Sequence, residues 1–430
     1  GTYHHWLETI TTLENAESAV EERVIKTLSI FGLGLAGERN RVSLELLVAA
    51  ASIPGQAAET RKAIGELVGR KLLLYRKNSD TVLLWHTSDI DLRGRLESEK
   101  TRLFVSFDLL SYLNELLPAE DWRPVEYNAS YKLFRFFSGY YVAAREASDL
   151  SLLSRSWDVF GRSGDGAGLY VLAENTEELD TVRRRLTETI VLDDRLVWIL
   201  PRTTEGLFET ALEAAAIGRL LKDSSLISED PLVLPELQHM LDDSLGYLMR
   251  LVEKLYTPSP EGPEVISQGR SMLIRSRREF RSYLSDIMAT VYSETPIFNN
   301  ELINKSNPSQ VLVNARKKLV LGILDRYGTS DLGIDGNRPD RSMFSTILLR
   351  TGLYFCDAHG RWRFAHPHEL ADDRLRAVWQ VVHDFFSSDP GRRRSFGELY
   401  GALQARPYGI RKGVIPILLA SGFRAFPSAV

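Results

Sequence analysis

The sequence predicts a mainly α-helical protein with an α/β centre, in which several winged-helix-like modules flank a small β-α-β domain. Three observations lead to this fold class. Apolar residues recur at helical spacing along most of the chain. Two short apolar runs near the middle are separated by one helix-length segment, as in a parallel β-α-β unit. In two other places, a helix precedes a pair of short apolar runs around a polar tip, which is typical of a winged helix.

The first winged-helix-like module is predicted within residues 16–86. Its first helix has an apolar face formed by Val20, Val24, Ile25, Leu28 and Phe31. Ser43 is placed to cap a second, short helix, and a turn at 53–55 leads into a third helix from about Gln56 to Arg70. In such a module, the third helix is the element that enters a DNA major groove.

The module closes with a predicted hairpin, whose strands 72–76 and 81–85 flank the polar tip 77–80. If the module binds DNA, the expected contacts to phosphate are Arg61, Lys62, Arg76 and Lys77. The third helix also carries Glu59 and Glu66, and phosphate affinity requires clustered cations. A structural or protein-binding role is therefore favoured over DNA contact.

A long helix capped by 88–92 is expected to continue to about Leu117, where Pro118 stops it. An aromatic and basic stretch follows, from Tyr127 to Tyr141. Aromatic rings between cations can stack single-stranded bases, but a strand packed on a core is the favoured interpretation.

The predicted α/β centre consists of a strand at 168–173, a helix at 177–190 and a second strand at 195–200. The length of the crossover favours parallel pairing of the two strands. Further helices are predicted at Leu207–Leu221 and Leu234–Tyr256.

A proline-rich linker, 257–263, separates the centre from the second half of the chain. The next helix, 275–292, has an apolar face and begins with Arg275, Arg277, Arg278 and Arg281. These arginines are interpreted as a solvated face, with a patch for phosphate or a partner as the alternative. A helix at 310–326 follows.

A second winged-helix-like unit is predicted from a helix at 341–351 and a hairpin with strands 353–356 and 362–365. The last helical set is interpreted as a third such unit without its wing; it comprises helices at Leu375–Ser387, Phe396–Leu403 and Lys412–Ala420. Arg411 and Lys412 complete the candidate nucleic-acid contacts.

The chain is divided into four predicted domains, and composition limits what they do. The ranges are 1–118, 119–257, 258–370 and 371–430. With 53 basic and 57 acidic residues, the net charge of −4 excludes a uniformly basic nucleic-acid wrapper. A single cysteine excludes an internal disulfide and a cysteine-built zinc site. No apolar stretch has the length of a membrane span, so a cytoplasmic protein without membrane contact is expected.

The chemistry search yields no catalytic residue, metal site or cofactor site in this segment. No Walker A phosphate loop occurs, so neither ATP binding nor hydrolysis is expected; the glycine-rich run 161–168 precedes a strand and lacks the lysine, so it is interpreted as a flexible loop. His366 and His368 could share a metal, but Pro367 between them weakens a regular strand. The histidine cluster is therefore predicted to be structural, with Cys356 as a buried thiol in its strand.

Several short phrases carry a family resemblance. They are Glu21–Leu28, Trp85–Asp91, Asn300–Lys305, Gly333–Gly336, Ser342–Phe344 and Pro407–Gly413. In this order they resemble the region that follows the motor in large bacterial P-loop ATPases of phage-defence systems. His86-Thr87 departs from the glycine-containing form of that phrase. The resemblance implies an ATPase motor before Gly1, and the missing initiator methionine and abrupt end also indicate a fragment.

Three functions remain open from the sequence. The leading one is a non-catalytic recognition and regulatory region of a larger defence ATPase, which couples the motor domain or subunit to double-stranded DNA or to other defence-system proteins. The second is a DNA-binding winged-helix regulator without a motor. The third is a nuclease or hydrolase that uses the α/β domain or the histidine cluster.

Overall fold

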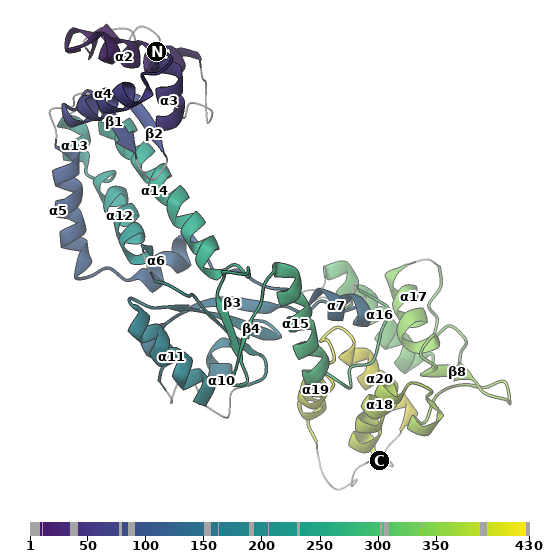
Figure 1. Cartoon of the computed structure of the whole chain (residues 1–430). Helices are drawn as coiled ribbons and strands as arrows, with labels where there is room; N and C mark the ends of the chain where they lie inside the picture. The colour runs from purple at the N-terminus through teal and green to yellow at the C-terminus, as the bar shows by residue number, and fades with distance from the viewer. Residues whose placement is uncertain are drawn as a thin grey trace. The chain divides into compact units, whose positions relative to one another are not determined.

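The computed structural model is mainly helical and has a five-stranded mixed sheet (Figure 1). It describes residues 9–10, 12–34, 42–76, 80–84, 91–149, 156–161, 163–188, 193–204, 206–229, 233–301, 303–304, 309–336, 338–387 and 394–426. The chain forms two compact units, the first from Gly1–Leu117 with Thr204–Lys254, the second from Pro118–Thr203 with Leu255–Val430. The four predicted domain ranges stay a prediction.

In the first unit, three helices precede an antiparallel hairpin, as predicted. The helices are α2 (Ala19–Gly34), α3 (Leu44–Ala51) and α4 (Ala57–Gly69), and the strands are β1 (Leu73–Arg76) and β2 (Thr81–Leu84). The Ser43 hydroxyl accepts a hydrogen bond from the Leu46 amide and caps α3. The apolar faces meet in one core that includes Val24, Ile25, Leu47, Leu67, Leu73 and Val82.

Further helices of the first unit lie, wholly or mostly, in its described residues. They are α5 (Leu92–Phe104), α6 (Leu109–Leu116), α12 (Leu207–Leu220), α13 (Ser224–Glu229) and α14 (Val233–Tyr256), of which α12 and α14 confirm the sequence prediction. The single long helix predicted up to Leu117 is wrong, because residues 105–108 interrupt it. The Asp108 carboxylate accepts the Leu110 amide and starts α6 as a separate helix. The predicted cap within 88–92 is confirmed at Asp91, whose carboxylate accepts the Gly94 amide at the start of α5, whereas 88–90 lie outside the described residues.

The sheet of the second unit has the order β3-β4-β5-β6-β7. Strands β3 (Phe137–Ala143), β4 (Gly166–Leu172) and β5 (Leu196–Leu200) are parallel, whereas β6 (Glu264–Ser267) and β7 (Arg270–Leu273) are antiparallel. The predicted β-α-β unit is confirmed as β4, α11 (Thr176–Glu188) and β5. The sheet also takes in strands from beyond residue 257, because the proline-rich segment turns the chain into β6.

The aromatic stretch that was expected to be one strand forms two elements. Its first part is α7 (Val125–Tyr131), which ends at Lys132 with a left-handed backbone, and only its second part enters the sheet as β3. The Asn128 side chain bonds both the backbone amide and the carbonyl of Arg135, which fixes the turn between them. Two short helices, α8 (Ala144–Ala147) and α10 (Ser156–Phe160), lie between β3 and β4 in the chain.

The rest of the second unit is helical around one large apolar core. Its first two helices, α15 (Arg277–Val291) and α16 (Gln310–Asp325), match the predictions. Next come α17 (Pro339–Met343), which continues into the π-helix η2 (Phe344–Leu349), and the predicted hairpin of β8 (Tyr354–Cys356) and β9 (Trp362–Phe364). The chain continues through η3 (Pro367–Glu369), α18 (Asp373–Phe386), α19 (Phe396–Gln404) and α20 (Ile415–Ala425). Among the described helices, none has the length and apolar character that crossing a membrane requires.

Candidate functional site

The candidate phosphate contacts on α4 are both paired with carboxylates. One guanidinium nitrogen of Arg61 lies 2.7 Å from both carboxylate oxygens of Glu45, and the Lys62 ammonium lies 3.4 Å from Glu66. Both cations remain largely exposed, so a phosphate would compete with these acids for them. The fourth candidate of this module, Lys77, lies outside the described residues.

The side chain of Arg76, at the end of β1, points toward α14 of the same unit. Its guanidinium lies 2.8 Å from a Glu236 oxygen and 3.4 Å from an Asp243 oxygen, both on α14, and the side chain is only 14% exposed. Because a partly buried guanidinium between two carboxylates is held firmly, this pairing fastens the hairpin to α14. Arg76 is therefore a structural anchor of the first unit.

Arg411 is likewise mostly buried in a polar cluster, here within the second unit. Its two terminal nitrogens each lie 2.8 Å from one oxygen of Asp165, and one of them also donates to the Phe134 carbonyl. Lys412 is exposed, and its carbonyl accepts a 3.4 Å hydrogen bond from Tyr400.

Arg135 completes this cluster, which we call the Asp165 clamp: Arg135, Asp165 and Arg411. Arg135 is almost fully buried, donates to Asp165 at 2.6 Å and donates to the Gly409 carbonyl at 2.7 Å. Its guanidinium also stacks 3.8 Å from the ring centre of Tyr292. Gly409 has φ +58°, and a β-carbon there would collide with Arg135 and Tyr292. The clamp therefore requires glycine at this position.

The electrostatics of the clamp favour its ionised form. Burial opposes the charge of Asp165, but the charges and hydrogen bonds of Arg135 and Arg411 outweigh it and hold the pKa of Asp165 below its ordinary value. Burial also opposes the charge of Arg135, and Asp165 in turn raises the Arg135 pKa. The clamp thus carries two guanidinium charges against one carboxylate in a nearly dry site.

A second set of ion pairs holds the same turn, residues 406–411. Arg406 lies 3.0 Å from an Asp193 oxygen, and Asp193 also binds Arg195 at 2.7 Å. Asp165 and Asp193 precede the parallel neighbours β4 and β5, so they stand at the same edge of the sheet. Together the two aspartates fasten the turn before α20 to the amino-terminal ends of the sheet strands.

The sequence did not predict the Asp165 clamp or the Asp193 ion pairs. Gly161–Gly168 was expected to be a flexible loop, although Asp165 lies within it and directly precedes a buried strand. The phrase 407–413 was noted only for its resemblance. The available signal was a charged residue beside a buried apolar segment, as Asp165 is beside β4. Its partner Arg411 is 246 positions away, so the sequence does not pair the two.

The histidine cluster has a geometry that corrects one expectation. Cys356 is exposed, because it ends β8 on the solvent side of the hairpin, and not buried as predicted. The rings of His366 and His368 stack with centres 5.7 Å apart. Glu369 binds Arg363 at 2.6 Å and accepts the His366 amide at 2.6 Å, and its pKa falls to about 2, chiefly through Arg363. Within the described ranges, no three histidine, cysteine or acidic side chains are arranged to hold a metal.

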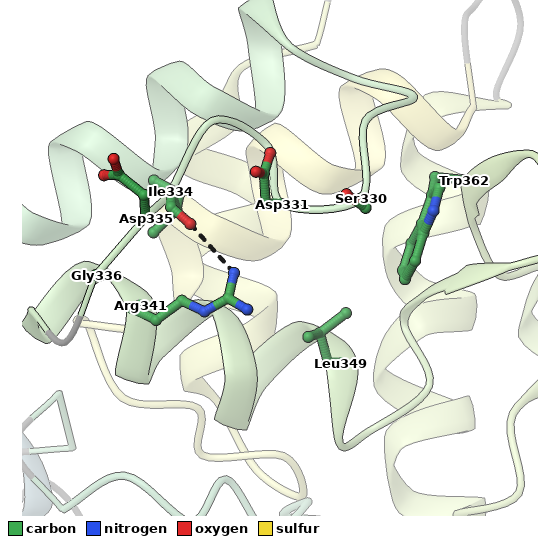
Figure 2. Close-up of a pocket in the computed structure, with 8 residues that line it drawn as sticks. All are labelled: Ser330, Asp331, Ile334, Asp335, Gly336, Arg341, Leu349 and Trp362. Carbon is green, nitrogen blue, oxygen red and sulfur yellow. Dashed lines mark hydrogen bonds between the residues drawn. The ribbon is translucent and has the colours of Figure 1, made fainter.

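One open hollow of about 770 Å³ lies in the second unit (Figure 2). Arg341 stands on one side, where it donates to the Ile334 carbonyl at 3.1 Å, and Trp362 stands on the other. Two acids also line it: Asp331, which accepts the Gly333 amide at 2.8 Å, and Asp335. The hollow therefore combines an indole with charges of both signs, and cysteine and histidine are absent from its lining.

Comparisons of the chain with models of protein families, with curated proteins and with solved structures found no match.

Proposed function

We propose that this chain is a non-catalytic recognition and regulatory region of a larger bacterial ATPase in anti-phage defence. It couples a motor domain or subunit to a partner, with the first winged-helix-like module as an adaptor that contacts protein. The assignment to a defence ATPase rests on the resemblance of the short phrases described above. The adaptor role rests on the geometry of the first unit.

The anchoring of Arg76 is the observation that carries the adaptor role. The wing of a DNA-binding module offers its cations to phosphate, whereas Arg76 is held by Glu236 and Asp243. Arg61 and Lys62 on the third helix are engaged with acids as well. A hairpin fixed to α14 transmits force or displacement between its own module and that helix, as an adaptor must.

The test uses the complete parent protein, purified with and without the change Arg76→Ala. ATP turnover is measured alone and with the isolated phage-defence partner or duplex DNA as stimulant. Loss of the anchor should lower the ratio of stimulated to basal turnover several-fold, because the hairpin no longer follows α14. Lys26→Ala, which removes an exposed cation paired with Glu22 on α2, serves as the matched control.

Two results would refute the proposal. A parent protein without ATP turnover would refute the assignment to an ATPase. An unchanged ratio of stimulated to basal turnover in Arg76→Ala would refute the adaptor role. A fall in the ratio that Lys26→Ala shares equally would also count against it, because the effect would then follow charge and not the anchor.

A further inference from the structure

A row of exposed arginines begins just before α15 and continues along its first turns. Arg275 directly precedes the cap residue Ser276, and Arg278 and Arg281 follow at intervals of three. Side chains three positions apart on a helix are neighbours, with about 5–6 Å between their β-carbons. We call these three residues the α15 arginine row.

The row differs from the cations that the sequence singled out. Within the part of the chain that the structure describes, no carboxylate lies within 4.0 Å of the side-chain nitrogens of Arg275, Arg278 or Arg281. By contrast, Arg61, Arg76 and Arg411 are each ion-paired. An unpaired guanidinium on the surface is available to an anion without displacing an acid.

The acids near the row are occupied by other groups. Glu279 accepts the Arg275 backbone amide, and Glu126 accepts the Ser282 hydroxyl. Glu120 pairs with Arg277, whose guanidinium lies 5.3 Å from the ring centre of Trp122, where Arg281 also lies at 5.8 Å. The chain as a whole is acidic, yet the five arginines of residues 270–281 outnumber the three carboxylates near the row, which belong to Glu120, Glu126 and Glu279. The row is thus a local positive surface that complements a polyanion.

The chemistry of the row fits the backbone of a duplex. Binding of single strands relies on exposed aromatic rings that stack bases. Trp122, whose ring centre lies 5.8 Å from the Arg281 guanidinium, and Phe280, which precedes Arg281 in sequence, are buried in this structure. Guanidinium groups along one helix flank, next to the amino-terminal end of a 15-residue helix, match phosphates spaced along a strand.

We propose that the α15 arginine row binds the phosphate backbone of double-stranded DNA, without reading its sequence. This inference rests on and deepens the proposed function, because it names the DNA surface of the recognition region and assigns it to the second unit instead of the first module. It does not require the motor, so binding is tested on the 430-residue chain itself. Failure of binding leaves the stimulated-turnover experiment to judge the adaptor role separately.

The experiment measures fluorescence anisotropy of a labelled 20-base-pair DNA of mixed sequence at several salt concentrations. Each phosphate contact contributes about 0.9 to the slope of log affinity against log salt. Arg278→Ala with Arg281→Ala should weaken binding about tenfold near 0.1 M salt and reduce the slope by about 2. The charge-matched control, Arg61→Ala with Lys62→Ala, should leave affinity and slope unchanged. Arg278→Lys with Arg281→Lys should retain most of the slope.

Several outcomes would overturn the proposal. They are no binding at 0.05 M salt, an equal loss in the control, an unchanged slope in the alanine variant, and tighter binding to phosphatidylglycerol vesicles than to the duplex. An RNA duplex of the same sequence, bound more tightly than the DNA, would overturn the assignment to DNA. Circular dichroism of each variant confirms that the fold is kept, and a collapse of the lysine variant's slope would contradict an electrostatic contact.

Discussion

Asp165 shows how one residue joins segments that the sequence keeps far apart. It accepts hydrogen bonds from Arg135 and Arg411, and both arginines also donate to backbone carbonyls. A buried carboxylate between two guanidinium groups stabilises the fold only as a complete set, because removing it leaves two buried charges without compensation. The identity of Asp165 therefore affects the stability of the second unit more than its position in a glycine-rich loop indicates.

Asp165→Asn should lower the free energy of unfolding of the second unit by about 3–5 kcal/mol. Asp165 has a lowered pKa in the folded chain, so its contribution is present above the unfolded value, about pH 3.9, and is lost as pH falls through the folded value. Urea unfolding at pH 7 and in steps below pH 4 measures both effects. The variant should lack that part of the acid dependence. Asp194→Asn, at a half-exposed neighbour of Arg406, should change stability little, and equal losses in both variants would contradict the clamp.

At the scale of elements, the sequence predicted those whose signal is local. Apolar residues recur at helical spacing in α2 and α15, because one face of each helix packs on a core. Ser43 is a typical capping residue, and its side chain caps the start of α3. Strands β6 and β7 have four residues each and are defined by pairing with β5, which a local pattern does not reveal. The Asp165 clamp could not be predicted from local patterns either, because its residues come together only when the 406–411 turn packs against the ends of the sheet strands.

The break between α5 and α6 was not predicted, because apolar residues continue through it and the local pattern is that of one helix. Val105 is 90% exposed, so its apolar character marks no core position. Asp108 decides the structure, since its carboxylate accepts the Leu110 amide at 3.1 Å and the Ser111 hydroxyl at 2.6 Å. A helix cap of this kind competes with continuation of the preceding helix.

Asp108→Ala should therefore destabilise the first unit by about 1 kcal/mol, the usual cost of losing a cap. Hydrogen exchange of the Leu110 amide should become faster, because its acceptor is gone. Ser98→Ala, at an exposed position inside α5, is the control and should leave both stability and exchange near those of the original chain. Unchanged exchange at Leu110 in Asp108→Ala would show that the cap does not hold this turn.

On the scale of the whole molecule, each compact unit holds buried apolar clusters of its own. Ile217 and Leu237 are fully buried in the first unit, and Leu319 and Trp379 are fully buried in the second. The chain crosses between the units three times, near residues 117, 203 and 254. Each unit thus contains segments that are distant in sequence, and its cooperativity comes from packing and not from chain continuity.

Separate cores predict separate unfolding transitions in differential scanning calorimetry. Ile217→Ala removes buried volume from the first unit and Leu319→Ala from the second, each at a cost of about 2–5 kcal/mol. For domains of this size, a loss of 1 kcal/mol lowers the melting temperature by roughly 2–4 °C. Each substitution should therefore lower one transition by several degrees and leave the other in place. A single transition that both substitutions lower equally would show that the two units unfold as one cooperative system.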